Sequence, residues 1–431
     1  MRNRGYLRLV GASTISNLGD GIGIIAYPWL ASGVTRNATL IALVAAAQRL
    51  PWLLFSLPAG VITDRVDRRR LMVSMDSVRA ALTLGVAAFV AWKSSGLPGP
   101  AELESVSGTN VSMYVVVLVA TLLLGCAEVL RDNASQTFLP AVVDKDDLEK
   151  ANGRLWSAEL VANSFAGPPL GSLLIGVAFA LPFFVDAATF AVAAGIVASI
   201  PGDFTPQTND DRAPWRDELK EGLRWLWSHE LLRPLAITLG VLNMLGMIPF
   251  ATLVLFGQEV LDTSATEFAL LGTGAAVGGV IGGFIASPVA KRVGEGPLLL
   301  VTLIGGGAIN IVIGLQSNWM VVWFFFGLAV ILGVVWNVIT VSLRQTVIPD
   351  GLLGRVNSVY RFFGWGMMPL GSLLGGLVVA FGDGTTSRET ALRLPWLLSG
   401  LLHIVLLLYA APRLTSAKVA AAREQAATAP N

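Results

Sequence analysis

Long apolar stretches alternate with short polar breaks along most of the 431-residue chain. A helix that crosses the hydrocarbon core of a membrane needs about 20 consecutive, mostly apolar residues, and each stretch reaches about this length. The stretches cover residues 7–31, 40–63, 71–92, 112–135, 153–177, 179–200, 233–257, 266–290, 297–316, 319–343, 356–381 and 393–412. This pattern predicts an all-α integral membrane protein with twelve transmembrane helices, and the very short breaks after 177 and 316 leave ten or eleven as the alternative.

Basic residues fall mainly on one side of these predicted spans. Loops on the cytoplasmic side of a membrane are enriched in Lys and Arg. With the N-terminus inside, that side collects most of the 30 Lys and Arg residues, whereas the opposite side holds Arg36, Lys93, Arg388 and Arg393. The asymmetry predicts that both termini are cytoplasmic, which requires an even number of spans.

The composition agrees with a membrane protein, because 54% of the residues are hydrophobic and only 14% are charged. Soluble domains carry about 25% charged residues. The 30 basic and 29 acidic residues nearly cancel, so no charge excess indicates a nucleic-acid partner. One cysteine, Cys126, and two distant histidines, His229 and His403, predict neither a disulfide framework nor a metal site. We expect no cofactor, and the sequence has no phosphate-binding Gly-x-x-x-x-Gly-Lys loop or hydrolase motif that would indicate an ATP-driven pump or an enzyme.

The polar segment 201–232 is the longest break between apolar stretches, and it divides the chain into halves of similar size. The string Pro-Leu-Gly-Ser-Leu-Leu occurs at 169–174 and again at 369–374, and upstream of each copy lies a Gln-Thr pair followed by a proline. This ordered series indicates an internal duplication. The predicted organisation is an N-terminal six-helix half at 1–200, a cytoplasmic linker at 201–232, a C-terminal six-helix half at 233–412 and a cytoplasmic tail at 413–431.

Part of the linker, residues 214–227, places apolar side chains close to helical spacing and basic side chains elsewhere on the turn. Two interpretations remain open. The segment is either a short helix on the cytoplasmic membrane surface or a linker helix that packs on the protein itself.

Charged side chains inside the predicted spans supply the candidate chemistry. A charge at the centre of a membrane helix costs about 2.5–3.5 kcal/mol on insertion scales, so each one needs a reason. Asp20 and Arg49 lie at similar depth in the first two spans, and Glu128 lies in the fourth. We hypothesise that Asp20, with Arg49 nearby, is a proton-coupling site and that Glu128 shares this role, because a carboxylate in a low-dielectric cavity can exchange protons. A fixed ion pair is the alternative, and Asp186 of the sixth span is expected to be structural.

The break between the second and third spans reads Gly60-Val-Ile-Thr-Asp64-Arg65-Val-Asp67-Arg68-Arg69-Arg70. It resembles the cytoplasmic loop signature of the major facilitator superfamily, Gly-x-x-x-Asp-Arg-x-Gly-Arg-Arg, with Asp67 in place of a glycine. Gly60 would allow neighbouring helices to approach closely. The resemblance implies that Asp64 and Arg65 latch the two halves together in an outward-facing state, with Arg131 of the fourth span placed to pair with Asp64. A simple positively charged turn is the alternative.

The fifth span contains Asn163-Ser-Phe-Ala-Gly167-Pro168-Pro169-Leu170-Gly171-Ser172. This resembles the antiporter signature of that superfamily's drug exporters, Gly-x-x-x-Gly-Pro-x-x-Gly-Gly, with Asn163 and Ser172 replacing two glycines. The resemblance implies exchange transport through Gly167, Pro168 and Gly171, whereas a structural kink is the alternative. Further short matches along the chain resemble the branch that holds bacterial macrolide-efflux and enterobactin-exporter-like proteins.

The resemblance and the charge pattern together predict a secondary active transporter that exports small amphipathic or hydrophobic compounds by alternating access. Proton antiport is the expected drive. The expected partners are a small-molecule substrate, protons and the lipid bilayer, and the expected form is a monomer in a bacterial-type inner membrane. A dedicated exporter of one metabolite or siderophore is an alternative, and a non-transporting membrane receptor or scaffold is another.

Overall fold

The structure is a computed structural model, and it describes residues 4–63, 65–94, 97–99, 102–103, 106–144, 147–202, 204 and 215–428. Within these ranges the regular secondary structure is helical, apart from one isolated antiparallel bridge between Thr35 and Thr109. Twelve helices in the described part of the chain are long and apolar enough to cross a membrane. The predicted all-α membrane fold is therefore confirmed.

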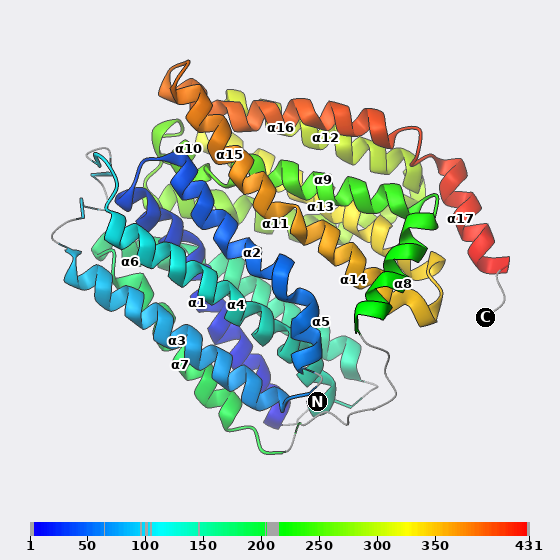
Figure 1. Ribbon diagram of the computed structural model, residues 1–431, viewed down its shortest axis with the longest axis horizontal. Coiled ribbons are helices and arrows are strands. Elements are labelled where there is room, and N and C mark those ends of the chain that lie inside the picture. The colour runs from blue at the N-terminus through cyan, green and yellow to red at the C-terminus, as the bar shows by residue number, and fades with distance from the viewer. Residues whose placement is uncertain are drawn as a thin grey trace. The chain divides into compact units, whose positions relative to one another are not determined.

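The chain forms two compact units, which are described separately: residues 1–210 with 263–272, and residues 211–262 with 273–431. The first unit holds α1 (Arg4–Val34), α2 (Ala38–Thr63), α3 (Arg68–Trp92), α4 (Val111–Val142), α5 (Leu148–Leu160), the π-helix η4 (Val161–Ala166), α6 (Gly167–Val177) and α7 (Leu181–Ala198) (Figure 1). Helix α1 packs along α6 and α7, while α3 packs between α4 and α7. The segments α5, η4 and α6 form a single span, Lys150–Val177.

The second unit contains the linker helix, the remaining long helices and a C-terminal helix. Its elements are α8 (Trp215–Ser228), α9 (Leu232–Phe250), α10 (Leu253–Glu259), most of α11 (Ala265–Val293), α12 (Glu295–Leu315), α13 (Trp319–Val347), α14 (Asp350–Gly366), α15 (Met368–Asp383), α16 (Arg388–Ala410) and α17 (Ser416–Thr428). Helix α12 packs on α16, and α15 packs on α9. Short helices α9 with α10, and α14 with α15, combine to give spans of sufficient length.

The repeated Pro-Leu-Gly-Ser-Leu-Leu string brings a glycine against the backbone of the first long helix in each unit. A Cβ atom at Gly171 of α6 would lie 2.8 Å from the carbonyl oxygen of Ile22 in α1. At Gly371 of α15 it would lie 2.2 Å from the carbonyl oxygen of Met244 in α9. Real Cβ atoms do not approach backbone oxygen atoms this closely, so both positions require glycine for the helices to meet.

Both spans that carry this string are interrupted just before it. In the fifth span the interruption is η4, followed by Gly167 and Pro168 at the start of α6. In the eleventh span α14 ends at Gly366 and α15 begins at Met368, one residue before Pro369. Proline removes a backbone donor and a π-helical turn widens the helix, so both features interrupt regular α-helical bonding within a span.

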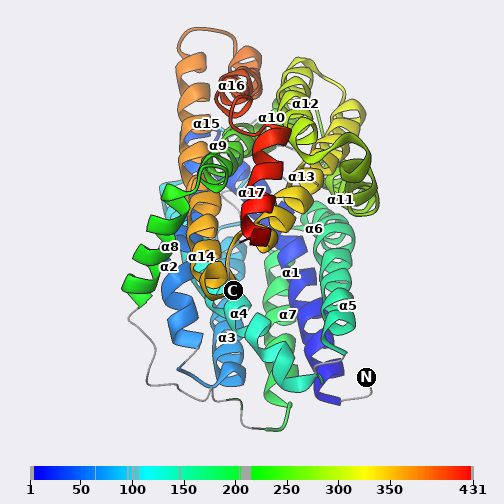
Figure 2. The same cartoon turned by 90° about the vertical axis from the view of Figure 1, so that its right-hand side faces the viewer.

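The linker helix α8 packs on the protein, which is one of the two interpretations that the sequence left open. Figures 1 and 2 both show α8 beside α14. Glu221 of α8 forms an ion pair with Arg355 of α14, and a Cβ at Gly222 would lie 2.8 Å from the Arg355 backbone. The ring of Trp227 stacks on Phe363 with the ring centroids 6.0 Å apart. The side chains of Trp215 and Arg216, which the amphipathic pattern also used, lie outside the described residues.

His229 joins α8 to α9 through backbone hydrogen bonds. Its Nδ1 atom accepts hydrogen bonds from the backbone N–H groups of Leu231 and Leu232, each at 3.2 Å. Burial lowers the pKa of His229, while the neighbouring Glu230 acts in the opposite direction. Because the neutral ring is the form that can accept these bonds, His229 serves as a cap for the start of α9.

Candidate functional site

Four helices of the first unit direct charged side chains into its interior. Helix α1 presents Ser13, Ser16 and Asp20 at positions three and four residues apart, which places them on one face. Helix α3 presents Asp76 and Arg79 one turn apart. The remaining groups are Glu128, Arg131 and Asp132 on α4, and Asp186, Thr189 and Phe190 on α7. The spacing on each helix is that of one helical face, so the four faces can meet.

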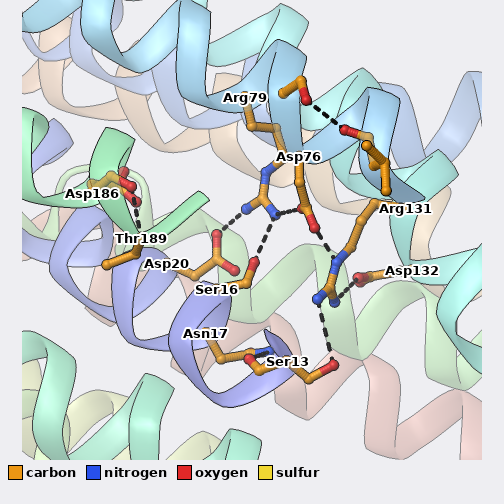
Figure 3. A network of polar contacts seen from close by, with 12 residues as sticks. Ser13, Ser16, Asn17, Asp20, Asp76, Arg79, Arg131, Asp132, Asp186 and Thr189 are labelled. Carbon is orange, nitrogen blue, oxygen red and sulfur yellow. Dashed lines mark hydrogen bonds and ion pairs between the residues drawn. The ribbon is translucent and has the colours of Figure 1, made fainter. Parts of the chain in front are cut away.

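Ion pairs connect α1, α3 and α4 in a continuous series (Figure 3). Asp20 Oδ1 pairs with Arg79 Nη2, and the other terminal nitrogen of Arg79, Nη1, lies 3.6 Å from Asp76 Oδ1. Arg131 continues the series, because its Nε atom lies 3.4 Å from Asp76 Oδ1 and its Nη1 atom lies 3.6 Å from Asp132 Oδ1. Each arginine is therefore shared between two carboxylates.

Hydroxyl and aromatic groups hold the two guanidinium groups in place. Arg79 Nη1 donates a hydrogen bond to Ser16 Oγ at 3.3 Å, and Arg131 Nη2 donates one to Ser13 Oγ at 3.4 Å. The guanidinium carbon of Arg79 also lies 3.9 Å from the centre of the Phe190 ring, which is a cation–π geometry. Ser13 and Ser16 on one face of α1 thus each accept a hydrogen bond from one of the two arginines.

Exposure separates the ends of this series from its centre. The side chains of Asp76, Arg79 and Arg131 are 0%, 4% and 3% exposed. Asp20 and Asp132, at the two ends, keep 28% and 36% of their side-chain surface. Buried charges of this kind depend on their partners, so the centre is a fixed part of the structure. Asp20 is an accessible end that shares Arg79 with Asp76.

A cavity of about 50 Å³ opens beside Asp20. Its polar lining includes Asp20, Tyr27, Gln48, Arg79, Glu128 and Asp186. The structure thus brings Glu128 and Asp20 to one cavity, as the sequence hypothesis required. It also brings Asp186 there, although the sequence analysis had expected a purely structural role for that residue.

The arginine that pairs with Asp20 is Arg79 of α3, and Arg49, the neighbour that the sequence suggested, lies on α2. Asp20 and Arg49 lie at similar depth in neighbouring spans, but similar depth does not determine which helices face each other. The signal for Arg79 was nevertheless present, since Asp76 and Arg79 stand one turn apart inside the third apolar stretch.

Among the described residues, Arg131 pairs with carboxylates of its own unit. Its guanidinium group contacts Asp76 and Asp132, because its side chain is buried within the unit. Asp64, the implied partner, lies outside the described residues. The close helix approach expected at Gly60 is not found among the described residues either, since a Cβ there would have nothing within 4 Å.

Two arginines of the loop donate hydrogen bonds to backbone carbonyl groups of neighbouring helices. Arg69 Nη1 donates to the carbonyl oxygen of Ile200 at 2.6 Å, just after the carboxyl end of α7, and Arg68 Nη1 donates to the carbonyl oxygen of Thr137, within α4, at 3.1 Å. Cations at helix carboxyl ends are favourable because backbone carbonyl groups there lack partners. Arg65 is exposed. These contacts give the loop arginines a structural role within the first unit.

Asp67, the residue that departs from the signature, ties the loop to the start of the linker. Its Oδ1 atom accepts a hydrogen bond from the backbone N–H of Arg70 at 2.8 Å and so caps α3. Its Oδ2 atom accepts one from the backbone N–H of Phe204 at 3.2 Å. The Phe204 ring packs on Phe138 with the ring centroids 4.5 Å apart. A glycine could make neither side-chain contact.

Solved structures with similar folds are membrane transporters. The chain matches a point mutant of the nucleoside transporter NupG with a TM-score of 0.73 at 11% identity, covering 94% of this chain and 98% of the other. It matches a bacterial homologue of the iron transporter ferroportin, in an inward-facing state, with a TM-score of 0.70 at 15% identity, covering 96% of this chain and 100% of the other. At these identities the likeness shows the fold alone. Together with the twelve spans, it shows that this chain has the membrane fold of these transporters.

The family follows from the sequence. A family model described as transmembrane secretion effector matches residues 1–426, and the chain belongs to this family of major facilitator superfamily transporters. The multidrug efflux pump Tap of Mycolicibacterium fortuitum is 28% identical over 413 residues, covering 94% of this chain and 96% of the relative. The enterobactin exporter EntS of Citrobacter koseri is 25% identical over 310 residues, covering 70% and 67%. The predicted superfamily and branch are thereby confirmed.

Proposed function

We propose that this protein exports small amphipathic or hydrophobic compounds in exchange for protons, with Asp20 as the residue that binds and releases the proton. The observation that carries the proposal is the sharing of Arg79 between the accessible Asp20 and the buried Asp76. A proton on Asp20 removes one of the two negative charges that hold Arg79. The guanidinium group is then held by Asp76 alone, and the contacts of α1 with α3 change accordingly.

Exchange transport requires that proton binding and substrate binding influence each other. Both would take place at the cavity beside Asp20. Asp20, Arg79 and Glu128 all line it. A compound that enters the cavity changes the surroundings of the same carboxylate that takes up the proton. Glu128 has the second role in this scheme, because it lines the same cavity from α4.

The names of the relatives support the direction of transport. The Tap relatives are named multidrug efflux pumps, and they align over more than nine-tenths of this chain. We therefore favour broad export of drug-like compounds. A dedicated siderophore or metabolite exporter is the second candidate, because the relative named an enterobactin exporter aligns over 70% of the chain.

The remaining features of the proposal concern topology and movement. An even number of spans puts both termini on one side, and the loop charges favour the cytoplasmic side of a bacterial inner membrane. The two six-helix halves, in a monomer, would alternate access to the site. In this scheme Asp64 and Arg65 act as the latch, and Gly167, Pro168 and Gly171 limit leakage through the fifth span.

The test compares efflux by the native protein and by Asp20→Asn in bacterial cells that lack their own drug pumps. Efflux of several unrelated dyes and antibiotics, and of one siderophore, is measured with and without a protonophore. The matched control is Asp217→Asn, which removes an exposed acid of α8 whose ion pair with Lys220 is itself exposed. We expect Asp20→Asn alone to abolish the protonophore-sensitive component.

Two outcomes would contradict the proposal. Native efflux that the protonophore does not affect would exclude proton drive. Unchanged efflux by Asp20→Asn, at equal amounts of protein in the membrane, would exclude Asp20 as the coupling residue. Efflux of the siderophore alone would instead select the dedicated exporter.

A further inference from the structure

Asp186 occupies an unusual position for a carboxylate. The residue is 3% exposed, and among the described residues its Oδ1 atom has no hydrogen-bond partner. The nearby hydroxyl of Thr189 donates a hydrogen bond to the backbone carbonyl of Asp186 at 2.7 Å. Figure 3 shows Asp186 on α7, apart from the ion pairs that join Asp20 to Asp132. Buried polar atoms in proteins are usually hydrogen-bonded, so an unpaired carboxylate oxygen beside a cavity is a candidate contact for a ligand.

Helix α1 makes room for this carboxylate. A Cβ atom at Gly19 would lie 2.3 Å from Asp186 Oδ1 and 2.1 Å from Thr189 Oγ1. At Gly23 it would lie 3.7 Å from Asp186 Oδ2. Only glycine at position 19 allows α1 to pass this close to the acid, so the local structure accommodates the carboxylate at the cavity rather than excluding it.

The charges around the cavity favour a cationic ligand. Three carboxylates line it, from Asp20, Glu128 and Asp186, against the single guanidinium group of Arg79. Arg79 is already engaged by Asp20 and by Asp76. A buried carboxylate that lacks a counter-charge is costly, and a positive group in the cavity would supply one.

A metal ion fits this site poorly. In the described part of the chain, no three His, Cys, Asp or Glu side chains come close enough together to hold a metal ion. The space of about 50 Å³ is several times the roughly 10–15 Å³ that a cavity needs to hold one water molecule. The cavity can therefore hold a small polar head such as an ammonium group, while the rest of a drug-sized molecule would lie beyond it.

Tyr27 adds a second contact for such a group. Its hydroxyl is buried and forms no hydrogen bond among the described residues, and its ring packs edge-on against Phe183 with the centroids 4.9 Å apart. An ammonium group carries several N–H donors and no acceptor. Asp186 and Tyr27 both line the cavity and carry oxygen acceptors for those donors, and the aromatic ring provides a further surface for a cation.

We propose that this cavity binds the protonated amine of a transported compound and that Asp186 is its counter-ion. The inference builds on the proposed function and specifies its substrate class as organic cations with an accessible amine. It separates two roles within one cavity, with Asp20 binding the coupling proton and Asp186 recognising the substrate.

The test is equilibrium binding to the purified full-length protein in detergent, which requires no proton gradient. The probes are dansyl-labelled hexylammonium and its N-acetylated derivative, which has the same chain and fluorophore without the charge. We expect native protein to bind the ammonium probe more tightly than the neutral one. Asp186→Asn should weaken binding of the ammonium probe by at least about tenfold, and it should leave binding of the neutral probe unchanged.

The proposal is overturned if Asp186→Asn binds the ammonium probe as tightly as native protein does, or if native protein does not prefer the charged probe. Equal loss of both probes in a variant with native thermal stability also overturns it, because Asp186 would then be structural. If Asp186→Asn does not fold, Asp186→Ser provides the same comparison with a residue that the second unit carries at the corresponding position. Since binding is measured without a gradient, a failure of proton drive in the efflux assay leaves this result intact.

Discussion

The two units of this protein share a packing scheme but differ in the chemistry of their interiors. Gly171 meets the backbone of α1 in the first unit, and Gly371 meets the backbone of α9 in the second. Matching Leu-Pro pairs begin at Leu181 in α7 and at Leu394 in α16. Four residues after each proline stand Asp186 and Ser399, respectively. Ser399 donates a hydrogen bond to the carbonyl oxygen of Leu245 at 2.8 Å and so needs no external partner.

The second unit also has neutral residues at the positions that correspond to the ion-paired residues of the first unit. Alignment of the Gln-Thr pairs, of the Arg-Val pairs at 65 and 292, and of the glycine contacts gives the residues of the second unit that correspond to the charged ones. They are Leu242 for Asp20, Leu303 for Asp76, Gly306 for Arg79, Asn337 for Glu128, Thr340 for Arg131 and Val341 for Asp132. The second unit therefore has uncharged residues at all of these positions. Because charges inside membrane spans are costly, the concentration of them in the first unit supports the functional role proposed for it.

The largest effect is expected from Asp76→Leu, which installs the residue of the second unit in the first. The change leaves Arg79 and Arg131 buried without their shared carboxylate, and breaking a buried pair in this way costs about 3–5 kcal/mol. Replacing both arginines as well, in Asp76→Leu/Arg79→Met/Arg131→Met, should recover a large part of that loss while transport stays abolished. Thermal unfolding in detergent measures the stability of the single and of the triple variant. A triple variant no more stable than the single one would show that the charges themselves hold the helices together.

Sequence predicted the fold well because the controlling signal is local. Twelve apolar stretches, each bounded by polar breaks, give twelve helices whatever their neighbours are. The Gly-Pro pair in the fifth span also indicated the interruption at Gly167, since Gly and Pro act on the backbone where they stand. These inferences need no knowledge of the arrangement of helices in space.

The site was predicted only in part, because pairing depends on how each helix is rotated. Asp20 and Glu128, which were selected as proton-coupling candidates on the cost of burying charge, both line one cavity. Arg79 was missed because its span begins with a run of arginines, and a further one in the third stretch did not stand out. Asp186 was undervalued because its distance from Asp20 along the chain hides the contact between α1 and α7.

The second prediction tests whether the glycine contact is equally important in both units. Gly171→Ala and Gly371→Ala each force a methyl group against a backbone oxygen atom, and overpacking of this kind costs about 1–3 kcal/mol. Gly371→Ala should be the more damaging, because its Cβ would lie 2.2 Å from the oxygen, compared with 2.8 Å for Gly171→Ala. Gly176→Ala is the control in α6, since nothing lies within 4 Å of that position. Equal melting temperatures for all three variants would contradict the shared packing scheme.

The third prediction concerns the N-cap residues of α3 and α12, which differ between the two units. The Arg-Val pairs are followed by Asp67 in the first unit and by Gly294 in the second. Asp67 has φ of −53° and caps α3, whereas Gly294 has φ of 90°, which side chains disfavour. Gly294→Asp should therefore destabilise the protein by about 1–3 kcal/mol.

Asp67→Gly should have the smaller effect, because replacing a helix cap by glycine costs only about a few tenths of a kcal/mol. Its specific consequence is the loss of the bond that holds the Phe204 backbone at 3.2 Å. Hydrogen exchange at Phe204 should rise in Asp67→Gly and stay at the native level in Gly294→Asp, with thermal unfolding recorded for both. Unchanged exchange at Phe204 in Asp67→Gly would mean that the linker is held by the packing of Phe204 on Phe138. The aspartate would then act only as a cap, and the departure from the loop signature would have no consequence beyond α3.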